Sequence, residues 1–411
     1  MSKNYNKTKY SCYFAYLAMS SVFALPPLLF VTFREMYGIS YTLLGTLVLV
    51  NFCTQFSVDI IFTLFSKYFN IHNTIKIMPL LTSLGLLIYA VLPSVFPNFA
   101  YLGLLLGTFI FSVAAGLCEV LLSPLVAALP SDNPKRDMST LHSLYAYGVV
   151  SVIIISTVFL KIFGNENWMY LSLFWAALPL ICFYLFSSSP MPEKIISNDG
   201  ENTKTKNKNK GIFLFAACIF LGSAAENSMT NWISSYLENG LKIPKIYGDI
   251  FGMCLFAILL GLGRTLYAKY GKNIVNVLLF GMIGASVCYL VTAFSTKIIL
   301  SVICSILIGF FTSMLWPGTL ILMEESYINP GVTAYALMAA GGDFGASVAP
   351  QILGVVVDKV KESHFAVNLS NTTSTTAEQI GMKFGMLAAA IFPIVGIFIL
   401  IYMKKYFSKS H

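Results

Sequence analysis

Long runs of apolar residues, separated by short polar segments, recur along the whole chain of 411 residues. Most of them reach the roughly 20 residues that a helix needs to cross the hydrocarbon core of a bilayer. Because backbone groups in lipid must satisfy their hydrogen bonds internally, runs of this length predict helices. The pattern predicts twelve helices, near residues 10–33, 41–66, 77–95, 99–129, 139–163, 168–188, 211–236, 247–270, 273–295, 298–323, 332–357 and 383–403.

The composition agrees with this pattern. Hydrophobic residues make up 57% of the chain and charged residues only 11%, whereas soluble proteins contain about 25% charged residues. The chain therefore lacks the polar surface that several soluble domains would require. We expect an all-α integral membrane protein.

The sequence offers little support for an enzyme. The eight cysteines stand singly in apolar stretches and the four histidines are scattered, so neither a disulfide framework nor a metal site is expected. The chain has no phosphate-binding loop of the GxxxxGK[ST] type, and no nucleophile–base pair stands out. We therefore expect no enzymatic activity and no cofactor.

The net charge of +8 is best explained by topology. If the N-terminus is inside, 18 of the 26 Lys and Arg residues fall in inner segments, as the positive-inside rule requires. This predicts that both termini are cytoplasmic, and it removes the reason to expect a nucleic-acid partner. No cleavable signal is evident, so we expect a multi-pass protein of the plasma membrane.

A polar, basic segment at 189–210 separates two groups of six helices. Its composition predicts a flexible cytoplasmic linker rather than a packed core. We therefore expect an N-terminal half at 1–188 and a C-terminal half at 211–411.

The two halves also repeat each other. The sequence TLFSKY at 63–68 ends the second predicted helix, and TLYAKY at 265–270 ends the eighth, 202 positions later. Pro124 and Pro317 hold similar places in the fourth and tenth helices. Since each half has an even number of helices, the halves are parallel. Such repeats are typical of secondary transporters with a solute site near the bilayer midplane between the halves.

Twelve helices, a basic central loop and parallel halves resemble the major facilitator superfamily. The residues GR at 263–264 and KYGK at 269–272 are similar to its loop motif after helix eight, whereas the copy at 66–70 lacks the acidic residue and the glycine. The resemblance implies two pseudo-symmetric six-helix halves and transport by alternating access.

Four carboxylates, Asp59, Glu119, Glu226 and Asp343, lie deep within predicted helices. An ionised side chain at this depth costs about 2.5–3.5 kcal/mol, so it usually faces a cavity or a partner. We expect Glu119, Glu226 and Asp343 to take part in proton coupling, and Asp59 and Arg264 to be gate or interface residues. The alternatives are hydrogen bonds between helices and, for Asp343, a pair with a neighbour such as Arg264.

Polar and aromatic side chains in the same helices are candidates for binding a solute. Hydroxyl groups need donors and acceptors, and an aromatic ring can stack on the apolar face of a sugar. For each candidate the competing interpretation is packing or hydrogen bonding between helices, and for Trp316 it includes a kink at Pro317. The candidates are Asn51, Gln55, His142, Glu226, Asn227, Trp232 and Trp316.

Several of these segments resemble the fucose–glucose–galactose proton symporter family. They are 116–119 with Pro124 and 129–130, 141–148, Glu226 with Trp232 and Tyr236, and 316–317 followed by 341–342, Pro350, Gly354 and Asp358. The resemblance implies that Glu119 takes part in proton coupling, and it adds Tyr147 to the candidate solute contacts. Unlike the fucose permeases, this chain has no Asp or Glu between Tyr13 and Phe33, where the first helix is expected.

The sequence thus predicts a monomeric secondary transporter that takes up a sugar or a similar polar solute together with protons. Two alternatives stay open. The many aromatic residues also suit a proton-coupled exporter of amphipathic compounds, and a solute receptor of the same fold would bind without transport. The solute itself, the direction and the choice between protons and sodium stay open as well.

Overall fold

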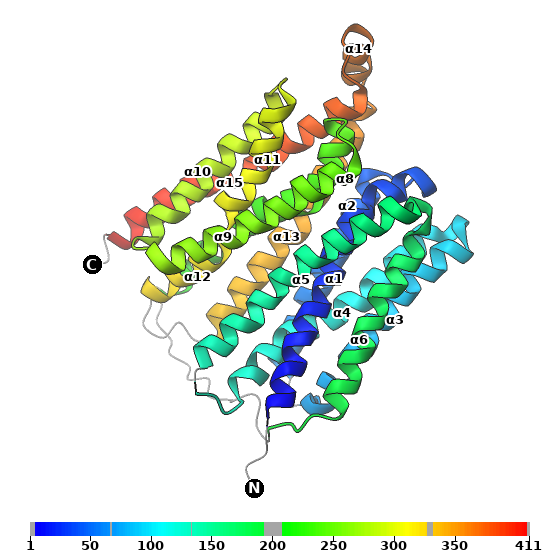
Figure 1. Cartoon of the computed structure of the whole chain (residues 1–411). Helices are drawn as coiled ribbons and strands as arrows, with labels where there is room; N and C mark the ends of the chain where they lie inside the picture. Colours follow the sequence, from blue (N-terminus) through cyan, green and yellow to red (C-terminus); the bar gives the residue numbers. More distant parts are fainter. Residues whose placement is uncertain (1–4, 66–67, 133, 193–207, 327–331, 409–411) are drawn as a thin grey trace. The chain divides into compact units, whose positions relative to one another are not determined.

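The structure is a computed structural model that describes residues 5–65, 68–132, 134–192, 208–326 and 332–408. These residues form helices joined by short loops, and no strand occurs among them (Figure 1). Twelve helical segments are long and apolar enough to cross a membrane. The expectation of an all-α protein with twelve membrane-spanning helices is therefore confirmed. Residues 193–207 of the expected linker lie outside the described residues.

Packing contacts divide the chain into two compact units. The first consists of Met1–Gly38 and Cys53–Asp199, and the second of Ile39–Phe52 and Gly200–His411. The segment Ile39–Phe52, which the sequence places in the N-terminal half, thus packs with the second unit.

The first unit is an arrangement of apolar helices in which α3 packs against α4 and α6, and α1 packs against α5 and α6. Gly85 and Gly107 allow α3 and α4 to approach closely, since a Cβ at either glycine would lie within 2.6 Å of the opposite backbone. The helices are α1 (Asn6–Tyr37), the later part of α2 (Tyr41–Phe65), α3 (Ile71–Val95), α4 (Ala100–Ala127), α5 (Pro134–Phe163) and α6 (Trp168–Ser187), with short 3-10 turns η2 (Pro97–Phe99) and η3 (Asn165–Asn167).

The second unit is less regular than the apolar pattern predicts. Three of its spans combine more than one element: α7 with the π-helical turn η4, α8 with the π-helical turn η5 and α9, and α11 with α12. The elements are α7 (Lys208–Ser235), η4 (Tyr236–Gly240), α8 (Lys245–Tyr247), η5 (Gly248–Cys254), α9 (Leu255–Tyr270), α10 (Ile274–Phe294), α11 (Ile298–Thr312), α12 (Leu315–Ser326), α13 (Val332–Lys361), α14 (His364–Thr372) and α15 (Ala377–Ser408).

The start of α2 belongs to the second unit because its first turn is bonded to α13 and α15. The backbone N–H of Thr42 donates to Asp358 Oδ2 at 2.6 Å, and the Tyr41 hydroxyl donates to Glu378 Oε1 at 2.9 Å. A carboxylate at this place satisfies one of the N–H groups that a helix start leaves without an intrahelical partner. Gly354 permits the approach, since a Cβ there would lie 2.4 Å from the Tyr41 carbonyl oxygen.

The sequence repeat has a structural counterpart at the starts of α3 and α10. Asn70 accepts a hydrogen bond from the Asn73 N–H, and Asn273 accepts one from the Asn276 N–H, each at 3.1 Å. Both asparagines are N-caps, a position that favours short side chains with an acceptor oxygen. The loops that follow the repeated sequences therefore end in the same way in the two units.

Asp137 ties the start of α5 to α1 outside the membrane-spanning part of α5. Its carboxylate accepts hydrogen bonds from Ser131 Oγ at 2.7 Å and Tyr13 OH at 3.2 Å, and Lys9 Nζ lies 3.2 Å away. The Ser131 hydrogen bond, followed by the contacts with Lys9 and Tyr13, lowers the pKa of Asp137 below its ordinary value. The charged form is therefore the one that the folded protein stabilises.

We expect Asp137→Asn to lower the unfolding temperature by about 2–4 °C at pH 7, because it removes charge-assisted hydrogen bonds worth roughly 1 kcal/mol. A lowered pKa stabilises the fold above the pKa of the unfolded carboxyl, about 4, and this contribution disappears as the pH falls through the folded pKa. The difference from wild type should thus shrink below about pH 4 in thermal unfolding. The exposed Asp132→Asn serves as the control, and an equal effect of both changes would contradict the assignment.

Candidate functional site

The four carboxylates that the sequence places in the membrane have different surroundings. Glu119 lies in α4 with an exposed side chain, and Asp59 is half-buried in α2. Asp343 is buried in α13, and Glu226 lies in α7 with 17% of its side chain exposed. Glu226 forms an ion pair with a cation from another helix, and it is the centre of the candidate site.

Glu226 in α7 pairs with Arg264 in α9. Arg264 Nη2 lies 3.4 Å from Glu226 Oε1, which is longer than the 2.7–2.9 Å usual for such charged contacts. The second oxygen, Glu226 Oε2, is buried and has no hydrogen-bond partner among the described residues. A buried acceptor without a partner costs roughly 1–3 kcal/mol. The carboxylate is therefore only partly satisfied, and a proton or an incoming donor would relieve this cost.

A break in the tenth span holds Arg264 in place. Helix α11 ends at Thr312 and α12 begins at Leu315, so Pro317 lies in the first turn of α12. Proline has no N–H and cannot donate to the carbonyl four residues earlier, which here is that of Ser313. Arg264 Nε donates to this Ser313 carbonyl at 3.0 Å instead. The kink expected at Pro317 thus provides an acceptor that orients the guanidinium.

Arg264 was expected at a gate or interface, with Asp343 as a partner to consider. The structure pairs Arg264 with Glu226, and it places Asp343 in the buried part of α13 next to Gly341 and Gly342. These glycines permit close helix approach, as expected: a Cβ at Gly341 would lie 2.9 Å from the Ala216 carbonyl oxygen.

Glu226 has polar neighbours along α7. Thr230 Oγ1 donates to the Glu226 carbonyl at 2.9 Å, and Asn227 Nδ2 donates to the Ser223 carbonyl and hydroxyl at 3.1 and 3.2 Å. Both side chains are half-buried. These bonds hold the two side chains against their own helix. They use the amide nitrogen of Asn227, so within the described residues its side-chain oxygen can still accept a hydrogen bond.

The aromatic residues that follow Glu226 in this span, one on α7 and one in η4, are engaged in packing. Trp232 and Tyr236 are fully buried. The Trp232 ring N–H donates to the Pro350 carbonyl at 3.1 Å, and the Tyr236 hydroxyl donates to the Thr292 carbonyl at 2.7 Å. Both polar groups are satisfied within the unit, so in this structure helix packing accounts for Trp232.

The remaining candidates for solute contact have different surroundings. Trp316 is half-buried, and its ring lies against Gly342, where a Cβ would come within 2.2 Å of it. Gln55 is buried at the close approach of α2 to Gly116 of α4. Asn51 is buried in the part of α2 that packs with the second unit, and Tyr147 is 68% exposed. The His142 side chain lies outside the described residues.

A second buried ion pair was missed by the sequence analysis. Asp249 in η5 is fully buried; Lys245 Nζ lies 3.2 Å from its Oδ2, and Ser234 Oγ donates to its Oδ1 at 2.5 Å. The four-residue spacing of Lys245 and Asp249 was the available signal. Because both carboxylate oxygens have partners, we assign this group to the structure of the eighth span.

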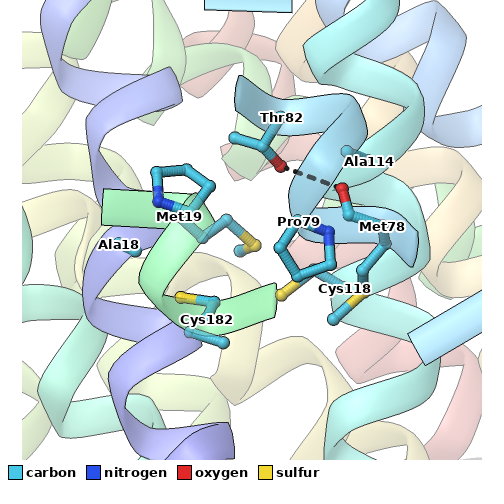
Figure 2. A pocket seen from close by; sticks show the side chains of 10 residues that line it. Ala18, Met19, Met78, Pro79, Thr82, Ala114, Cys118 and Cys182 are labelled. Carbon is cyan, nitrogen blue, oxygen red and sulfur yellow. Dashed lines mark hydrogen bonds between the residues drawn. The ribbon is translucent and has the colours of Figure 1, made fainter. Parts of the chain in front are cut away.

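The first unit contains an apolar cavity bounded by α1, α3, α4 and α6. The cavity is small, with a volume of about 20 Å³, and Figure 2 shows the side chains of Met19, Cys118 and Cys182 around it. The lining contains no charged side chain, and a space of this size holds no solute. Its larger members are Met19, Met78, Pro79, Cys118, Pro179 and Cys182.

Among solved structures, the chain is similar to a bacterial homolog of the human lysosomal transporter Spinster, with a TM-score of 0.77, 13% identity, and coverage of 100% of this chain and 99% of that chain. The D-xylose–proton symporter gives a TM-score of 0.74, 14% identity and 97% coverage of both chains. The E. coli fucose:proton symporter FucP gives 0.58, 13% identity, and coverage of 96% and 99%. At these identities the similarity shows the fold alone, so the narrower fucose permease resemblance stays a prediction.

In sequence, no curated protein matches the chain, but the model of the Major Facilitator Superfamily matches residues 11–350. This match covers most of the chain and agrees with its twelve membrane-spanning helices. The chain therefore belongs to the Major Facilitator Superfamily, and it is a multi-pass membrane transporter of small solutes rather than an enzyme.

Proposed function

We propose that this transporter takes up a small polar solute together with protons, and that sugars are the first class to test. The observation that supports the proposal is the incomplete Glu226–Arg264 ion pair within the membrane-spanning part of the second unit. We further propose that it works as a monomer in the plasma membrane with both termini in the cytoplasm.

The pair can link proton binding to solute binding, because the Glu226 carboxylate and the solute compete for Arg264. A proton on Glu226 removes the negative charge that attracts Arg264, and it gives the carboxyl a donor for a solute oxygen. Arg264 stays anchored at the Ser313 carbonyl, so its remaining N–H groups become available to the solute. Solute binding and protonation then favour each other, and this linkage must be reciprocal.

Other residues have supporting roles in the proposal. Asn227 and Thr230 lie on α7 beside Glu226 and offer hydrogen-bond partners to hydroxyl groups. We propose the exposed Glu119 of α4 as a second proton site, and Asn51, Gln55, Tyr147 and Trp316 stay candidate solute contacts. Asp343 stays a candidate for proton coupling, and Asp59 stays a candidate gate residue.

The names of the structural neighbours agree with testing sugars first, but they do not single out one solute. Two are proton symporters of the sugars xylose and fucose, and another is the nucleoside transporter NupG, at 16% identity. All three solutes carry several hydroxyl groups, which require the kind of donors and acceptors found on α7.

The proposal is tested by following pH outside proteoliposomes while hexoses, deoxyhexoses, pentoses and nucleosides are added in weak buffer. We expect one solute class to cause alkalinisation that is absent with Glu226→Gln and retained with Glu325→Gln, an exposed glutamate at the end of α12. Binding without any proton or solute flux would favour the receptor, and proton release on addition of solute would indicate antiport.

Export of amphipathic compounds stays a second candidate function, because the chain is rich in aromatic residues and poor in charged ones. If this alternative holds, we expect proton-driven export of lipophilic cations or dyes together with no response across the sugar panel.

A further inference from the structure

We infer that the solute bound at Glu226 and Arg264 carries one carboxylate, and that it is a sugar acid rather than a neutral sugar. The inference rests on the proposed function, because it names the class of solute for the same pair.

The hydrogen bonding and the exposure of the Arg264 guanidinium favour an anionic ligand. A guanidinium has five N–H groups in a fixed planar fork. One of them, on Nε, donates to the Ser313 carbonyl at 3.0 Å, and Nη2 makes the single long contact with Glu226 at 3.4 Å. The side chain is 45% exposed. Arg264 is thus fixed in direction while most of its fork is open, which suits bidentate binding of a carboxylate.

The charge balance of the pair favours a monoanion. Glu226 and Arg264 together are neutral when both are ionised. If Glu226 takes a proton while a neutral sugar binds, Arg264 keeps an unpaired positive charge inside the membrane-spanning region, which is costly. A ligand with one negative charge restores neutrality, whereas a dianion would leave an excess negative charge. The ligand therefore replaces the Glu226 carboxylate rather than adding to it.

The surroundings of the pair distinguish a sugar acid from a plain fatty or aromatic acid. Thr230 and Asn227 follow Glu226 on α7; both are half-buried and carry an oxygen that can accept a hydrogen bond. A ligand that covers these acceptors without donating to them leaves them unsatisfied, which weakens its binding. Hydroxyl groups next to the carboxylate would supply those donors.

The test compares matched pairs of ligands on the purified, full-length protein. D-glucose is compared with D-glucuronate and D-gluconate, and D-galactose with D-galacturonate, by thermal stabilisation and by competition for binding at pH 5.5, where these acids are ionised. Butyrate serves as the acid without hydroxyl groups. We expect the sugar acids to bind at least about 10-fold more tightly than the neutral sugars and butyrate, as a charge-assisted bidentate contact predicts.

Arg264→Gln should abolish this preference, and Arg264→Lys should keep part of it, since lysine supplies the charge without the fork. The Arg264→Lys variant also controls for folding, because it retains a cation at the same place. Equal binding of acid and neutral partner, or an undiminished preference in Arg264→Gln, would overturn the inference.

The two proposals fail in different ways. If a neutral sugar binds and drives proton uptake while its acid does neither, the proposed function stands and this inference is wrong. If a sugar acid binds through Arg264 but no solute moves protons, the ligand class is supported and the proton-coupled function is wrong.

Discussion

Glu119→Gln is expected to reduce accumulation of solute against its gradient strongly while leaving exchange of solute between the two sides of the membrane. The side chain of Glu119 is exposed on α4, within the candidate span Pro97–Ala127. A charged carboxylate facing lipid at this depth would cost about 2.5–3.5 kcal/mol, so we place it on a path that water and protons can reach. Glutamine keeps the shape of the protonated acid but cannot release the proton.

The expected loss of accumulation follows from the linkage between proton and solute. Linkage between two ligands typically changes affinity by about 5–150-fold. Proton-driven accumulation in proteoliposomes should fall by that order, whereas counterflow of labelled solute should stay within about twofold of wild type. Glu119→Asp, which retains a titratable group, serves as the control. Accumulation by Glu119→Gln that equals wild type would show that the proton is carried elsewhere.

The membrane-spanning helices were predictable because length and apolarity alone determine them. Where a span is a single apolar helix, as in α4 or α10, the expected ranges of 99–129 and 273–295 lie close to Ala100–Ala127 and Ile274–Phe294. The short helix α14 was not expected, since its nine residues form no apolar run. The π-helical turns η4 and η5 were not expected either, because hydropathy carries no signal for a change in hydrogen-bond register.

For the site, the sequence identified the charged residues but could not pair them. Glu226 and Arg264 stood out because ionisable side chains are rare in apolar helices, yet they are 38 positions apart and their contact depends on how α7 and α9 pack. Pro317 indicates that the Ser313 carbonyl lacks its helical donor. That Arg264 is the group that donates to it can be seen only when the packing of α9 is known. Trp232 and Tyr236 were attractive as aromatic residues near a carboxylate, but burial and hydrogen bonding engage both of them.

The position of Glu226 depends on how closely α7 approaches α13. Gly341 and Gly345 have the spacing of a small-xxx-small motif, which lets membrane helices pack closely. A Cβ at Gly345 would lie 2.2 Å from the Phe220 carbonyl oxygen and 3.2 Å from the Ala224 nitrogen. Both atoms belong to the backbone of α7, so no side-chain rotation can make room, and even one methyl group must separate the helices.

Gly345→Ala is therefore expected to destabilise the protein although alanine is the better helix former. Overpacking costs about 1–3 kcal/mol, and at about 2–4 °C per kcal/mol for a unit of this size the unfolding temperature should fall by roughly 2–12 °C. The matched control is Gly261→Ala in α9, where a Cβ meets nothing within 4 Å, so the gain in helix propensity of about 1 kcal/mol should leave its stability equal or higher. Thermal unfolding of the two variants and wild type in the same detergent measures the difference. If Gly345→Ala unfolds at the temperature of Gly261→Ala, then α7 and α13 do not approach this closely, and the placement of Glu226 beside Arg264 loses its structural basis.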